Sequence, residues 1–169
     1  MFKFFFYFIG IQLALFSIEQ TNYVYNTIII PFTGMIAYIS GWVIKLFDEN
    51  VISQGVILQQ VNNGYSVSIQ SGCNGVEAVL VLFSAIIAFP SPWKYKFMGI
   101  ISGFFAVEVI NIIRIISLFY LVQWNSLLFE WAHLYVWQAL IMLDVLIIFL
   151  LWLRFLPVQP ETGAESLAS

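Results

Sequence analysis

The chain has 169 residues, of which 62% are hydrophobic and 9% are charged, and its formal net charge is −3. Soluble domains carry about 25% charged residues, so these polar side chains are too few to cover a water-facing globule, and a mean hydropathy of +0.94 favours burial in a bilayer. The length argues against a second domain, and the lack of a basic run argues against nucleic-acid binding.

The first two apolar segments are residues 1–18 and residues 28–47. The first has Lys3 near its start and no small-residue cleavage site after it, so we interpret it as an uncleaved span. The second is ambiguous, because it suits either a helix packed in a bundle or a helix lying in the plane of the outer leaflet. Small side chains line much of one face of this segment, at Thr33, Ala37, Ser40 and Gly41.

Residues 48–72 form the one substantial polar insert. Residues 65–70 alternate apolar and polar side chains, which is typical of a strand. Residues 56–61 supply a partner strand, and Asn62-Asn63-Gly64 between them is a tight-turn signal. We therefore predict a small periplasmic β-hairpin whose second strand runs directly into Cys73.

Cys73 is the single cysteine, which excludes an internal disulfide. It is predicted to lie where a strand ends and a helix begins, and the unpaired amides of a helix start stabilise a thiolate and an acyl oxyanion. Gly72 and Gly75 would let a substrate backbone approach closely. The alternative is an inert buried thiol. One Cys and one His fall short of a zinc shell, so no metal and no cofactor are expected.

Two polar residues follow Cys73 at the start of the apolar segment 75–89. Glu77 lies one helical turn after Cys73 and is placed to orient His133 or to pair with Arg114. The alternative is a capping box, with Asn74 as the N-cap and Glu77 three residues later. The segment itself is short for a ~30 Å hydrocarbon core, so it needs its flanks or a thinned bilayer to cross.

Basic residues set the predicted orientation, since short cytoplasmic loops are enriched in Lys and Arg. Those flanking the later spans are Lys94, Lys96 and Arg154. They place residues 48–73 and the loop 123–132 outside. Lys3 in the cytoplasm requires an even number of spans, which favours four with residues 28–47 on the outer leaflet. Five spans with an external N-terminus are the alternative.

Arg114 lies inside the apolar segment 97–122, where an arginine costs roughly 2.5–3.5 kcal/mol on insertion scales. It would bind a substrate carboxylate or stabilise an oxyanion. Asn111, about one turn earlier, would brace it. The alternative is a structural ion pair with Glu77, Glu108 or Asp144.

His133 is the single histidine and opens the last span, residues 134–153. An imidazole there can take a proton from a thiol and return it to a leaving amine. The alternative is a residue of an interfacial aromatic belt. The predicted fold is thus an all-α polytopic membrane protein, with four or five membrane helices plus one in-plane or re-entrant segment. We expect residues 1–155 to form one transmembrane domain and residues 156–169 to form a disordered cytoplasmic tail.

These elements together resemble the exosortase/archaeosortase family. They read Ser71-Gly72-Cys73-Asn74-Gly75-Val76-Glu77, then Asn111-Ile112-Ile113-Arg114-Ile115, then Glu130-Trp131-Ala132-His133-Leu134-Tyr135. The amino-acid sequence around these residues is most similar to that of the short H-type exosortases, and the similarity extends over roughly residues 31–154. The chain departs from commoner members in having Asn74 in place of Ser, and Glu77 is not a general family feature.

The resemblance implies a Cys73–Arg114–His133 active site at the periplasmic face of a bacterial inner membrane. It implies cleavage of exported proteins that carry a C-terminal sorting signal, namely a short motif, a transmembrane helix and a basic cluster. For H-type members the motif resembles Ile-Pro-Thr-Leu-x-x-Trp-Gly. The cleaved protein would pass through a thioester to an acceptor, with a membrane lipid or a glycan among the candidates. The alternatives are a non-enzymatic small transporter or assembly subunit, and a Cys-dependent membrane acyltransferase.

Overall fold

A computed structural model describes residues 2–157 of the chain. Four of its helices are long and apolar enough to cross a bilayer: Phe2–Glu19, Asn22–Lys45, Trp93–Trp124 and Ser126–Arg154. Helix α4 (Val76–Ala88) is apolar but shorter. The predicted polytopic membrane fold, mostly helical with a small β element, is confirmed. Most of the predicted tail, from residue 158 onward, lies outside the described residues.

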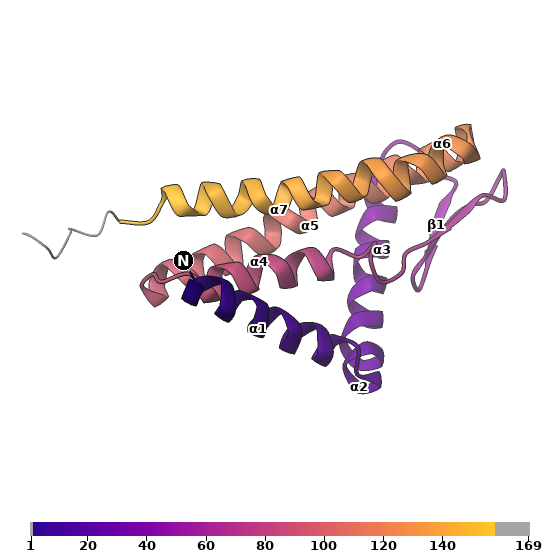
Figure 1. The fold of residues 1–169 in the computed structure, drawn as a ribbon. Coiled ribbons are helices and arrows are strands. Elements are labelled where there is room, and N and C mark those ends of the chain that lie inside the picture. The colour runs from indigo at the N-terminus through magenta and orange to yellow at the C-terminus, as the bar shows by residue number, and fades with distance from the viewer. Residues whose placement is uncertain (1, 158–169) are drawn as a thin grey trace, which may run out of the picture.

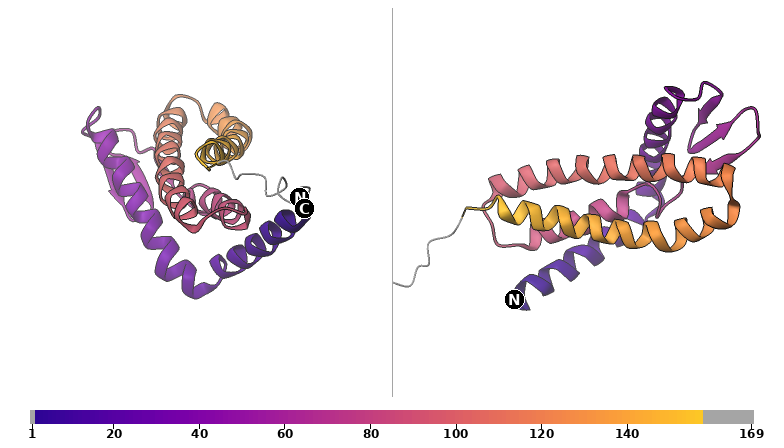
Figure 2. Two further views of the ribbon diagram at one scale, coloured as in Figure 1. Left: turned by 90° about the vertical axis from the view of Figure 1, so that its left-hand side faces the viewer. Right: turned by 90° about the horizontal axis from the view of Figure 1, so that it is seen from above.

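Helices α4, α5 (Trp93–Trp124) and α7 (Trp137–Arg154) lie lengthwise beside one another and form the body of the fold (Figure 1). Helix α1 (Phe2–Glu19) packs against α4, and both described ends of the chain reach the same end of this body. Helix α3 (Ile30–Lys45) runs across the body, since the left view of Figure 2 shows α5 and α7 end-on and α3 lengthwise. This direction fits the in-plane interpretation of residues 28–47.

Two irregular stretches interrupt the helices. A short α2 (Asn22–Val24) and the π-helical turn η1 (Tyr25–Ile29) lead into α3. A second π-helical turn, η2 (Ala132–Val136), lies between α6 (Ser126–Trp131) and α7. Because π-helical turns re-aim side chains locally and occur often at functional sites, the second one is of interest for the histidine that it contains.

The prediction of a loop over residues 123–132 is wrong, because most of these residues are helical. Only Asn125, with φ −156° and ψ 115°, interrupts the helix, and α6 begins directly after it. The Asn125 side-chain oxygen accepts hydrogen bonds from the second and third amides of α6, at 2.9 and 3.1 Å. This N-cap restarts the helix at once, so His133 lies within a continuing helix rather than at its start.

The polar insert forms an antiparallel sheet in the order β1-β2-β3. Strands β2 (Ile57–Gln60) and β3 (Ser66–Ser68) are the predicted hairpin, with Leu58 opposite Val67. Strand β1 (Val51–Gln54) was not predicted. It pairs with β2 across a turn at Gly55, and its four residues are too few to show a strand period by themselves.

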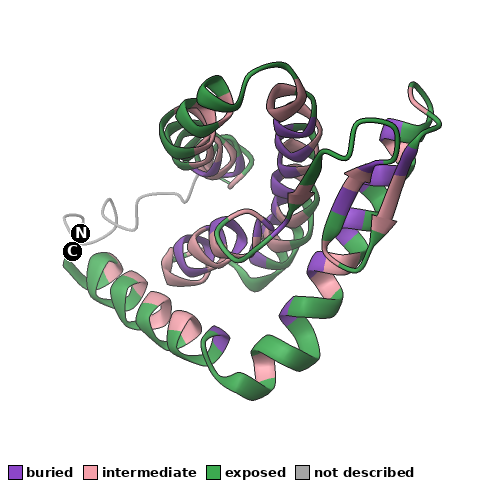
Figure 3. Cartoon of the chain, turned by 90° about the vertical axis from the view of Figure 1, so that its right-hand side faces the viewer, coloured by how far each residue is buried: buried purple, intermediate pink, exposed green. Residues whose placement is uncertain are grey.

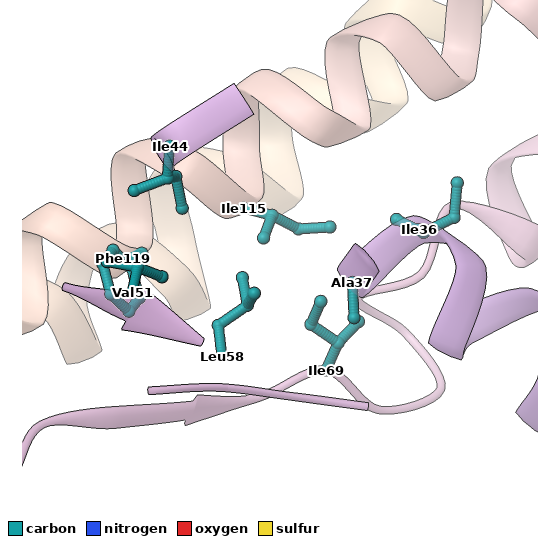
Figure 4. Close-up of a cluster of buried hydrophobic side chains, with 8 residues drawn as sticks. All are labelled: Ile36, Ala37, Ile44, Val51, Leu58, Ile69, Ile115 and Phe119. Carbon is teal, nitrogen blue, oxygen red and sulfur yellow. The ribbon is translucent and has the colours of Figure 1, made fainter. Parts of the chain in front are cut away.

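The sheet packs on α3 and α5 through one buried cluster (Figure 4), made of Ile36, Ala37, Ile44, Val51, Leu58, Ile69, Ile115 and Phe119. The small face of α3 makes this contact possible. A Cβ atom on Gly41 would lie 3.1 Å from Leu58 Cδ2 and 3.2 Å from Ser53 Cβ. The sheet, and the chain that leaves β3, are thereby held against α5.

Large apolar side chains are exposed along α1 and α7, and Figure 3 colours most of α1 as exposed or half-buried. On a soluble protein so much exposed apolar area marks an interface or an aggregation site, whereas in a bilayer it is the surface that lipid solvates. At the end of the body away from the sheet, the rings of Phe89 and Trp152 pack edge-on with centroids 5.8 Å apart. The Trp152 indole also contacts Gly99 and so joins α7 to α5.

Candidate active site

Cys73 lies in the loop that joins β3 to α4. The loop passes twice through left-handed backbone, at Gly72 (φ +83°) and Gly75 (φ +82°), which glycine adopts without strain. Helix α4 begins at Val76 with Gly75 as its N-cap, so Cys73 precedes the helix. Cys73 thus lies between the strand and the helix, as predicted, but the thiol's polar contacts come from two other helices.

The first contact joins the single cysteine to the single histidine. Cys73 Sγ lies 2.9 Å from His133 Nε2. The imidazole is carried by η2, and its ring lies against Phe129 with centroids 5.6 Å apart. At this distance an imidazole can accept the proton of the thiol.

The second contact comes from Arg114, the largest fully buried side chain, which is 1% exposed. Its Nη2 donates to Cys73 Sγ at 3.5 Å, and its Nη1 donates to the Gly72 carbonyl at 3.3 Å. The guanidinium thus places positive charge beside the sulfur and holds the preceding peptide group. Its Nε has no hydrogen-bond partner among the described residues.

The surroundings of Cys73 favour the protonated form of its thiol. Burial raises the pKa of the Cys73 thiol above its ordinary value, Arg114 offsets part of this rise, and the negative charge of Glu77 adds to it. A low-pKa thiolate, as expected from a helix start, is therefore not what the structure supports. A neutral thiol needs a base at the moment of attack, and His133 is within reach to be that base.

Among the described residues, Glu77 bonds to the loop rather than to His133 or Arg114. Its Oε1 accepts a hydrogen bond from the Gly72 amide at 2.5 Å. Both backbone polar groups of Gly72 are therefore held, the amide by Glu77 and the carbonyl by Arg114. This fixes the backbone immediately before the thiol.

Asn74 is fully buried and ties the loop to α3. Its Nδ2 donates to Thr33 Oγ1 at 3.0 Å, and its Oδ1 accepts from the Val76 amide at 3.2 Å. The predicted capping box does not form, because Gly75 is the N-cap and Glu77 bonds to Gly72 instead. Thr33 carried no signal beyond its small size, so its part in holding the loop was missed.

Asn111 of α5 packs against the loop at Gly75. Its Nδ2 donates to Glu108 Oε2 at 3.4 Å, and a Cβ atom on Gly75 would meet both side chains. The structure gives Asn111 no hydrogen bond to Arg114, although both line a small cavity of about 10 Å³ together with Asp144. Glu108 was expected only as a possible ion-pair partner of Arg114, and its packing under Gly75 was missed.

Cys73, Arg114 and His133 line one cavity of about 40 Å³ at the end of the body next to the sheet. Its remaining walls come from α5, α6 and the end of β3, through Ile115, Leu118, Phe129, Val67, Ser68 and Ile69. Within residues 2–157, no group of three or more His, Cys, Asp or Glu side chains is placed to hold a metal ion. A thiol, a base and a buried cation in one pocket suit nucleophilic acyl transfer.

Comparison with known proteins identifies one family. The family model described as transmembrane exosortase matches residues 3–154, which include every residue of this pocket. No curated protein and no solved structure matches the chain. The match therefore covers well over half of the chain.

Proposed function

The chain belongs to the transmembrane exosortase family, and we propose that it is a membrane-embedded cysteine transpeptidase of the H-type. In this proposal it cleaves the C-terminal sorting signals of exported proteins through a thioester on Cys73 and transfers them to an acceptor. The observation that carries the proposal is the 2.9 Å separation of Cys73 Sγ from His133 Nε2, with Arg114 Nη2 at 3.5 Å from the same sulfur.

Acylation begins with proton transfer from the Cys73 thiol to His133 Nε2. This requires the resting imidazole to carry its proton on Nδ1. The sulfur bonds to the scissile carbonyl carbon, and the carbonyl electron pair moves onto oxygen. The tetrahedral intermediate then reforms the carbonyl and breaks the C–N bond, and the leaving amine takes the proton from His133. The exported protein is left as a thioester on Cys73.

Arg114 is the group suited to stabilise the oxyanion. Its Nε has no hydrogen-bond partner within residues 2–157, and its two other nitrogens already lie at the sulfur and at the Gly72 carbonyl. A preorganised donor in a buried site is worth about 2.7–4 kcal/mol of transition-state stabilisation. That value is comparable to the roughly 2.5–3.5 kcal/mol cost of placing an arginine in the membrane.

Deacylation repeats the steps in reverse order. An acceptor amine or hydroxyl approaches the thioester and gives its proton to His133 as it attacks, and the Cys73 sulfur leaves and is reprotonated. Water in place of the acceptor would give hydrolysis. A membrane lipid or a glycan is the proposed acceptor class.

The proposed location is the bacterial inner membrane, with the pocket facing the periplasm. The Trp152 indole donates to the Tyr95 carbonyl at 2.9 Å, so the start of α5 and the end of α7 lie together. The basic residues Lys94, Lys96 and Arg154 are therefore gathered at the end of the body away from Cys73. Because Lys and Arg favour the cytoplasmic side, this arrangement supports a periplasmic pocket.

The test is processing of a reporter that ends in a motif resembling Ile-Pro-Thr-Leu-x-x-Trp-Gly, followed by an apolar helix and a basic cluster. With the wild-type enzyme we expect the reporter to lose its signal. With Cys73→Ala or His133→Ala, cleavage should fall by on the order of 10³-fold or more. Full processing by Cys73→Ala would overturn the proposal and favour a non-enzymatic transporter or assembly subunit.

A further inference from the structure

Strand β3 is the outer strand of the sheet, and within residues 2–157 no strand pairs with its far side. The edge of such a strand presents unpaired amides and carbonyls, to which another extended chain can bond. Natural edges are often protected by Lys, Pro or a bulge. Strand β3 reads Ser-Val-Ser and has none of these.

The register shows which groups point outward. The Tyr65 carbonyl and the Ile69 amide both bond to the β2 side, at 2.8 and 2.9 Å. Bonded positions alternate along an antiparallel pair, so Val67, between them, also bonds to β2. Ser66 and Ser68 then direct their amides and carbonyls away from β2, and both residues are exposed.

This free edge borders the catalytic pocket. Ser68 lines the same cavity as Cys73 and His133. Phe129 forms part of the same cavity wall from α6. An extended chain lying along β3 would therefore pass beside the sulfur and within reach of the imidazole.

We propose that the sorting motif binds as an added strand on the free edge of β3, with its backbone paired to Ser66 and Ser68. This rests on the proposed function and names how its substrate is held. Backbone pairing tolerates many sequences, whereas pockets for individual side chains give specificity. The cavity of about 40 Å³ is small, so it selects one small side chain next to the scissile carbonyl while the rest of the motif stays on the edge.

Proline substitution tests the pairing, because proline lacks an amide and is tolerated where that amide faces outward on an edge strand. The matched pairs are Ser68→Pro against Ser68→Ala and Ser66→Pro against Ser66→Ala. Each alanine variant keeps the amide that its proline partner removes. We expect each proline variant to cleave the reporter about tenfold more slowly than its alanine partner, chiefly through a higher KM.

Alkylation of Cys73 by iodoacetamide checks that the pocket is intact, and we expect equal rates in the two members of each pair. If the wild type cleaves the reporter and each pair cleaves equally, the edge proposal fails while the proposed function stands. If the alanine variants lose as much as the proline variants, the serine hydroxyls bind the substrate and the edge proposal also fails. If the wild type does not cleave the reporter at all, the proposed function fails and takes this inference with it.

Discussion

Gly75 tests whether the tight loop around Cys73 is set by the packing beneath it. In Gly75→Ala the new side chain would sit at φ +82°, which costs about 1–2 kcal/mol for a residue with a Cβ. The Cβ would also lie 2.7 Å from Glu108 Oε1 and 3.0 Å from Asn111 Nδ2. These two side chains are 5% and 1% exposed, so they have no solvent to move into, and overpacking of this kind costs about 1–3 kcal/mol.

The expected loss of stability is the sum of the two effects, about 2–5 kcal/mol. Gly72→Ala is the matched control, because its φ is +83° but nothing lies within 4 Å of the new Cβ. It should lose only the backbone part, about 1–2 kcal/mol. Gly10→Ala, inside α1 with open space around it, should be neutral or gain up to about 1 kcal/mol.

The assay is equilibrium unfolding in mixed micelles with increasing denaturing detergent, followed by circular dichroism. Cleavage of the sorting-signal reporter is measured in parallel, and Gly75→Ala should lose more activity than unfolding alone explains, because the loop that carries Cys73 shifts. Equal destabilisation by Gly72→Ala and Gly75→Ala would refute the packing of Glu108 and Asn111 under the loop.

Three further predictions concern the same loop. Because burial raises the pKa of the Cys73 thiol, its alkylation by iodoacetamide should rise steadily from about pH 6 to about pH 9, and a plateau below about pH 7 would contradict this. Glu77→Ala leaves the Gly72 amide without its acceptor and should slow cleavage of the reporter by about tenfold. Glu77→Gln keeps an acceptor oxygen there and should lose less activity. A greater loss in Glu77→Gln than in Glu77→Ala would contradict this role of the hydrogen bond. Thr33→Val removes the acceptor of the buried Asn74 amide and should cost about 1–3 kcal/mol in micelle unfolding. Thr33→Ser should restore most of that stability, and equal stability of the two variants would speak against this bond.

The sequence predicted the features that follow from composition or from the free-energy cost of placing a charge in lipid. Long apolar runs identify membrane helices because about 20 residues are needed to cross the core. Arg114 is conspicuous because lipid makes a buried guanidinium expensive. The chain has one cysteine and one histidine. Any thiol–imidazole pair within it therefore has to consist of Cys73 and His133.

Features that depend on a pairing strand, on a single capping side chain or on a distant contact were missed or misplaced. Strand β1 is four residues long and exists because β2 pairs with it. The helix over residues 126–131 depends on one capping side chain, Asn125. The environment of the Cys73 thiol is set by burial and by the charges of Arg114 and Glu77. The burial and the contact with Arg114 depend on the tertiary fold, and local sequence reports neither.

Intact mass spectrometry of the enzyme, mixed briefly with the reporter and quenched in acid, tests the central claim most directly. The account predicts an added mass equal to the reporter fragment before the cleavage site. That mass should map to Cys73, be removed by hydroxylamine, and be absent in Cys73→Ala. Cleavage of the reporter without any adduct, or an adduct that persists in Cys73→Ala, would contradict it.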